Sequence, residues 1–131
     1  MRDQIVAVLA LALASNASVG RITESHVPAW LPGFWRMTHD EDQGQTGSLA
    51  EFRSDGTYVY YERNCAAHPA LPFHVHNGEI YVTNFIPKKG PVSVVFHPSA
   101  DHGHLTYTSP RTFNNARFER VAISDCREEA P

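Results

Sequence analysis

The chain has 131 residues, of which 11 are basic and 14 acidic, and the formal net charge of −3 is spread along it. This length suits one domain with one modest core. With no basic patch or stripe, the sequence lacks the electrostatic footprint of a protein that binds nucleic acid or anionic lipid, so neither is an expected partner.

The first 17 residues have the features of a secretory signal. Residues 1–4 are polar, residues 5–14 are uninterrupted apolar, and Ser15 and Ala17 place small side chains at a cleavage site. We predict cleavage after Ala17, although Asp3 offsets Arg2 in the polar start; the alternative is a short buried N-terminal helix. Ten apolar residues are too few for a membrane span, which needs about twenty. The sequence therefore predicts a periplasmic or secreted protein without a transmembrane segment.

Short strands separated by turn residues make up most of the remaining chain. Residues 18–32 are predicted to be a linker that caps the barrel, and Asp55-Gly56 and Asn77-Gly78 are hairpin-turn signals. Strands are expected at 33–39, 47–53, 56–62, 71–76, 79–86, 91–97, 103–109 and 115–122. Sequential hairpins predict an all-β fold: one eight-stranded up-and-down antiparallel barrel over residues 33–123, followed by a tail, 124–131.

The chain has two cysteines, Cys65 and Cys126. In an oxidising compartment an even pair most simply forms one disulfide, which here would tie the tail to the barrel. The alternative is two unpaired thiols.

Gly33-Phe34-Trp35 on the first predicted strand, together with an arginine on the last one, resembles the lipocalin or calycin group in a shortened bacterial-type form. The resemblance implies that Trp35 closes the bottom of the barrel and that Arg117 or Arg120 stacks over it. It also implies a role in carrying a ligand inside the barrel. The chain lacks the family's Thr-Asp-Tyr-type motif and its long helix after the eighth strand. Its strands are also short, and such a barrel is often filled by its own side chains.

Several aromatic residues are candidates for the wall of an apolar cavity, with tyrosine hydroxyls to orient a small ligand. Filling of the core is the alternative interpretation. The candidates are Tyr58, Tyr60, Tyr81, Phe96 and Tyr107.

Histidines occur in two pairs, His74 with His76 and His102 with His104, and residues two apart on a strand share a face. The apolar residues that alternate with them favour an outward orientation, so exposed histidines are the simpler interpretation. A surface metal site is the alternative, because imidazoles in this spacing bind zinc or copper.

No catalytic constellation stands out. Ser99, Asp101 and His102 crowd one loop, but without a nucleophile elbow or an oxyanion hole. We therefore expect an exported, non-enzymatic binding protein that holds a small apolar ligand and needs no cofactor. The alternatives are a protein-binding module, such as a secreted-enzyme inhibitor or toxin immunity protein, and a histidine-based metal binder.

Overall fold

The computed structural model describes residues 26–122 and Cys126. The predicted signal peptide, the start of the predicted linker and the tail apart from Cys126 lie outside the described residues. No helix in the described part of the chain is long and apolar enough to cross a membrane.

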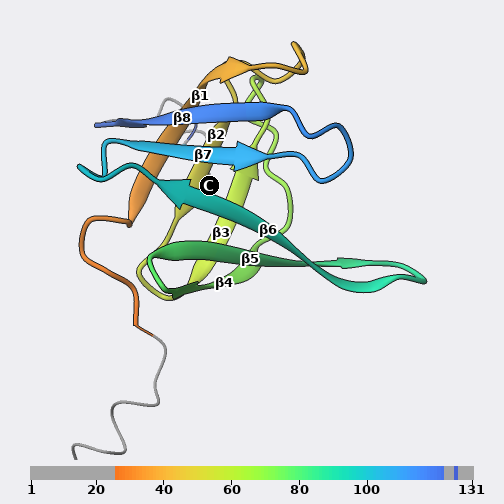
Figure 1. Cartoon of the computed structure of the whole chain (residues 1–131), viewed down its shortest axis with the longest axis horizontal. Coiled ribbons are helices and arrows are strands. Elements are labelled where there is room, and N and C mark those ends of the chain that lie inside the picture. Colours follow the sequence, from red (N-terminus) through yellow and green to blue (C-terminus); the bar gives the residue numbers. More distant parts are fainter. Residues whose placement is uncertain (1–25, 123–125, 127–131) are drawn as a thin grey trace, which may run out of the picture.

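Eight antiparallel strands form one closed barrel, each hydrogen-bonded to its neighbours in chain order, with β8 closing on β1 (Figure 1). The predicted all-β, single-domain meander is thus confirmed. The strands are β1 (Gly33–Asp40), β2 (Leu49–Phe52), β3 (Thr57–Tyr61), β4 (Leu71–His76), β5 (Glu79–Ile86), β6 (Gly90–Pro98), β7 (His104–Thr108) and β8 (Asn115–Val121).

The hairpin signals lie where the sequence predicts them. Asn77 and Gly78 join β4 to β5 with φ values of 52° and 78°, which is the pair of positive values that a tight two-residue hairpin requires. Asn and Gly both tolerate this region, so the local sequence alone determines the turn.

A packed aromatic core fills the middle of the barrel. The Phe52 ring lies 5.1 Å from that of Tyr58, 5.2 Å from Phe73 and 5.4 Å from Phe96. The last two are edge-to-face contacts, the favoured arrangement of aromatic quadrupoles. The barrel therefore has a solid centre, and open space is left only towards its ends.

One end of the barrel is closed by Trp35 and Arg120. The Arg120 guanidinium lies 4.4 Å from the centre of the Trp35 ring and donates to the carbonyl of Pro32 at 3.2 Å. Trp35 is fully buried and its Nε1 donates to the Leu31 carbonyl at 3.1 Å, so the end of the linker seals this end. Of the two candidate arginines, Arg120 thus stacks on Trp35. Arg117 is exposed on the barrel wall.

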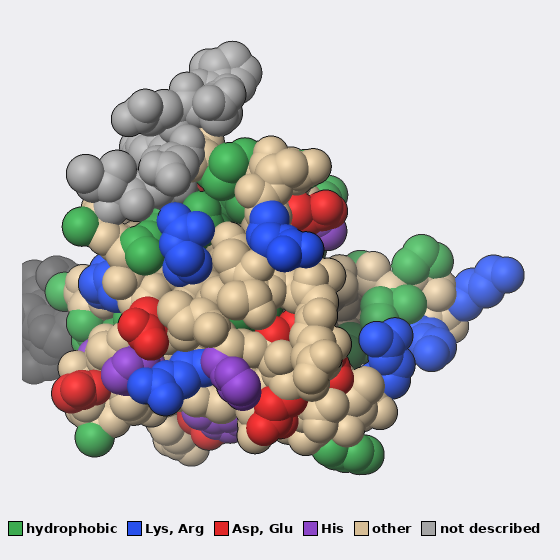
Figure 2. Space-filling model, turned by 90° about the horizontal axis from the view of Figure 1, so that it is seen from above, with side chains coloured by type: hydrophobic (Ala, Val, Ile, Leu, Met, Phe, Trp, Pro, Cys, Tyr) green, Lys and Arg blue, Asp and Glu red, His purple; other side chains and the backbone are tan. Residues whose placement is uncertain are grey.

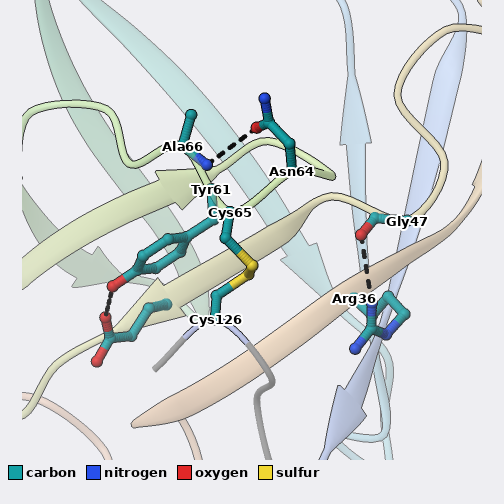
Figure 3. The surroundings of a disulfide bond; sticks show 8 residues. Arg36, Gly47, Tyr61, Asn64, Cys65, Ala66 and Cys126 are labelled. Carbon is teal, nitrogen blue, oxygen red and sulfur yellow. Dashed lines mark hydrogen bonds between the residues drawn. A yellow bond between two sulfur atoms is a disulfide. The ribbon is translucent and has the colours of Figure 1, made fainter. Parts of the chain in front are cut away.

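A second apolar cluster lies on the outer face of β1 to β3. It contains Phe34, Leu49, Val59, Tyr61 and Cys126. The Cys65–Cys126 disulfide joins the β3–β4 loop to the C-terminal segment beside this cluster, which confirms the predicted bridge (Figure 3).

Glu51 lies buried on this same outer face. Only 7% of it is exposed. Tyr61 donates a 2.8 Å hydrogen bond to its carboxylate, and Arg53 pairs with it at 3.2 Å. The cluster therefore buries one acidic group with two partners.

Strands β5 and β6 are longer than their neighbours and extend past them. β4 pairs with β5 only as far as Val82, and β7 pairs with β6 only from Phe96. Residues 83–95 therefore form a two-stranded projection, the β5–β6 arm, which has a free edge on each side (Figure 1).

Candidate ligand site at the barrel mouth

The barrel has one closed end and one open end. In an up-and-down barrel the β1–β2, β3–β4, β5–β6 and β7–β8 connections lie together, opposite the end that Trp35 and Arg120 close. At this open end is a hollow of about 330 Å³, the mouth hollow, between the β1–β2 and β7–β8 loops. Its lining residues are Met37, Asp40, Asp42, Gly44, Gln45, Tyr107, Ser109, Arg111, Asn114 and Ala116.

The β1–β2 loop at the rim is organised by Asp40. The Asp40 carboxylate accepts hydrogen bonds from the backbone N–H groups of Asp42, Gly44 and Gln45 at 2.9 to 3.1 Å. Partial burial alone would raise the pKa of Asp40, but these three donors outweigh it and lower the pKa below its usual value. The rim loop is thus held by an ionised carboxylate.

Asp42 ties this loop to the β7–β8 loop across the mouth. Its carboxylate accepts hydrogen bonds from Asn114 Nδ2 at 2.7 Å and from Thr112 Oγ1 at 3.0 Å. Both sides of the hollow are therefore joined before any ligand binds, which reduces the ordering cost of binding.

Tyr58 lies in the core beneath the mouth hollow and is only 8% exposed. Burial raises its pKa, and the nearby phenols of Tyr60 and Tyr107 raise it further. No described residue forms a hydrogen bond with the Tyr58 hydroxyl. The hydroxyl oxygen keeps some solvent accessibility, so water can satisfy it.

Tyr60 and Tyr107 flank Tyr58 on the side of the mouth. Tyr60 donates a 2.9 Å hydrogen bond to Gln45 Oε1, and Gln45 lines the hollow. The ring of Tyr107 packs 5.8 Å from that of Phe96. The structure therefore brings together three of the five predicted aromatic candidates; we call Tyr58, Tyr60 and Tyr107 the tyrosine trio.

Ser48 adds a second unpartnered hydroxyl at this end of the barrel. Ser48 immediately precedes β2 and lies two residues before the inward-facing Ala50, so it is on the same face of the strand. It is fully buried. Its Oγ atom has no hydrogen-bond partner among the described residues. Among the described residues, Ser48 Oγ is thus the one fully buried side-chain polar atom without a partner, and it adjoins the open end.

The prediction that Tyr81 faces the barrel interior is wrong. Ile80 and Val82 occupy the inward positions of β5, so Tyr81 lies on the outer face, stacked 5.2 Å from His74. Phe96 points inward, but it is 2% exposed and contacts four other aromatic rings. Phe96 therefore fills the core beneath the tyrosine trio and does not line open space.

The two histidine pairs do not come together. His74 and His76 are exposed on β4. His102 stacks on Trp30 at 4.1 Å, and His104 lies 3.9 Å from Glu119. Across the residues that the structure describes, no group of three or more potential ligands gathers at a metal-sized site.

The fold and the hollow define a closed eight-stranded antiparallel barrel with one sealed end and one polar-rimmed open end. No family model matches this chain, and no curated protein or solved structure matches it. Functional inference therefore depends on the geometry of the barrel.

Proposed function

We propose that this protein is an exported, non-enzymatic binding protein of the lipocalin-like type, which holds a small ligand at the open end of its barrel. The observation that carries the proposal is the preformed mouth hollow of about 330 Å³, which lies at the end of the barrel opposite the Trp35–Arg120 closure. The closure of the other end by Gly33, Trp35 and Arg120 supports the family likeness. The disulfide supports an oxidising compartment.

The mouth hollow is lined by both polar and apolar side chains, so the site favours a small ligand that combines an apolar part with hydrogen-bonding groups. A hollow of about 330 Å³ lies at the lower end of the range for ligand pockets, so a lipid with long acyl chains would not fit inside it. Tyr107, Met37 and Ala116 supply apolar wall. The side chains of Ser109 and Arg111 supply hydrogen-bond donors for its polar groups.

Native mass spectrometry of the protein purified without denaturation from its host compartment tests the proposal. We expect a discrete small adduct that is lost on denaturation. Tyr107→Phe should reduce the adduct because Tyr107 lines the hollow, whereas Tyr81→Phe, which removes the same atom from the outer face, should leave it unchanged. A bare wild-type protein would overturn the proposal.

A protein-binding module is the second candidate, and the packed centre of the barrel is the observation that favours it. Such a module would use its rim loops and would not need an interior site. The same experiment separates the two, because a co-purified polypeptide in place of a small adduct would indicate the module.

A further inference from the structure

The β5–β6 arm is a second feature of the molecule, and closure of the barrel does not require it. It projects from the open end, and residues 83–95 contact neither β4 nor β7 through strand pairing (Figure 1). Its tip is a turn closed by the Lys89 N–H, which donates to the carbonyl of Ile86 at 3.0 Å. Val94 at the base of the arm packs against the core, but the exposed tip contributes little to folding, so the side chains of the tip require another explanation.

Large exposed apolar side chains gather at this end of the described structure. Phe85 is 73% exposed and Ile86 is 37% exposed, both at the end of the arm, and Phe113 on the β7–β8 loop is 79% exposed. No other large apolar side chain in the described residues is comparably exposed. Single exposed apolar residues are common, but their concentration on projecting hairpins is typical of a contact surface.

The tip of the arm is positively charged. It carries Lys88 and Lys89, and no acidic residue occurs between Ile80 and Pro98. Figure 2 shows basic and hydrophobic side chains together on the projecting part of the molecule. The chain's net charge of −3 conceals this local excess, which is why composition alone predicts no affinity for anionic lipid.

The acidic residues Asp40, Glu41 and Asp42 also lie at the open end, on the β1–β2 loop. Each accepts a hydrogen bond from the rim. Asp40 accepts from the Gly44 N–H of the β1–β2 loop, whereas Glu41 accepts from the Asn115 N–H and Asp42 from Asn114 Nδ2 across the mouth. These carboxylates keep their negative charge and organise the mouth, while Lys88 and Lys89 on the arm form no ion pair with a described residue.

The arm is poorly suited to bind a partner by strand addition. Pro91 has no N–H to offer to an added strand, and Pro87 and the two lysines interrupt the edge at the turn. Recognition must therefore use the side chains at the tip, where apolar and cationic groups lie next to each other.

We propose that the β5–β6 arm docks on an anionic phospholipid surface. Phe85 and Ile86 would enter the interfacial region, and Lys88 and Lys89 would lie at the level of the lipid phosphates. This combination of apolar insertion and charge attraction fits a lipid surface better than a protein partner, because the arm offers a narrow tip and no broad face. The proposal does not depend on a ligand in the mouth hollow.

Sedimentation with vesicles tests this proposal. The full-length mature protein is mixed with vesicles of phosphatidylcholine containing phosphatidylglycerol, and with vesicles of phosphatidylcholine alone. We expect binding to the anionic vesicles that weakens as salt increases. The Lys88→Gln/Lys89→Gln variant should bind about thirtyfold more weakly, because each lysine near an anionic surface adds about 1 kcal/mol to the attraction. Phe85→Ser should weaken binding by about as much.

Arg117→Gln is the matched control, since it removes one exposed positive charge from the barrel wall and should change binding less than twofold. Thermal unfolding of each variant confirms that it folds. Absence of wild-type binding to anionic vesicles, or equal binding by the arm variants, would overturn the proposal. Sedimentation velocity that shows a dimer abolished by Phe85→Ser, without vesicle binding, would assign the tip to a second copy instead.

Discussion

Replacing Tyr58 by phenylalanine should slightly stabilise the protein. The substitution keeps the ring contacts with Phe52 and Phe96, at 5.1 and 5.9 Å, and removes only a hydroxyl that no described residue satisfies. Leaving a buried polar group unsatisfied costs about 1–3 kcal/mol. Because the hydroxyl lies towards the mouth and can retain some hydration, we expect a gain of about 1 kcal/mol, or roughly 5 °C in Tm for a domain of this size.

Tyr61→Phe provides the control on the opposite face of the same strand. The Tyr61 hydroxyl donates to the buried carboxylate of Glu51 at 2.8 Å, so its loss should destabilise the protein by about 2 kcal/mol. Both free energies of unfolding are measured by urea denaturation of ligand-free protein. If Tyr58→Phe destabilises the protein as much as Tyr61→Phe does, the Tyr58 hydroxyl is already satisfied and the reasoning fails.

Three further predictions concern the closed end, the disulfide and the rim. Gly33→Ala should destabilise the protein by about 2 kcal/mol, because Gly33 has a φ of 135° and an added Cβ would lie 2.8 Å from Arg120 Nη1. A urea titration that shows no change in stability would contradict this geometry. Double replacement of Cys65 and Cys126 by serine should lower the free energy of unfolding by at most about 4 kcal/mol, since the bridge spans a sequence separation of 61; an unchanged urea midpoint would refute this. The pKa of Asp40 is lowered in the folded state, so its contribution is present above the unfolded-state pKa of about 4 and is lost as pH falls through the lower, folded-state pKa. Urea titrations across this range should therefore show a smaller acid-induced loss of stability in Asp40→Asn than in the wild type, and identical pH profiles would contradict the role of Asp40.

The fold was predictable because its signals are local. The observed β4 (Leu71–His76) and β5 (Glu79–Ile86) match the predicted segments, and Asn77-Gly78 between them has the backbone conformation that its side chains favour. Alternation and turn chemistry act within a few residues, so they can be read without knowledge of the tertiary structure.

The candidate site was predictable only in part, because the alternation of side chains along a strand does not say which face of that strand points into the barrel. Around Tyr81 both faces of the strand carry an apolar side chain, and it is Ile80 and Val82 that take the interior positions. Glu51 lies on the polar face of β2, but the outer apolar cluster and Tyr61 bury it. The outward position of Tyr81 and the burial of Glu51 both depend on contacts between strands, and these contacts form only when the barrel closes.

The sequence by itself determined the number and order of the strands, the turns between them and the pairing of Cys65 with Cys126, since these follow from short-range preference and from cysteine count. Only the tertiary structure selected Arg120 to stack on Trp35, left Tyr58 without a partner beneath the mouth hollow and extended residues 83–95 beyond the barrel. The physical reason is that closure of the barrel sets the stagger between strands, and the stagger decides which side chains meet and which strand ends remain uncovered.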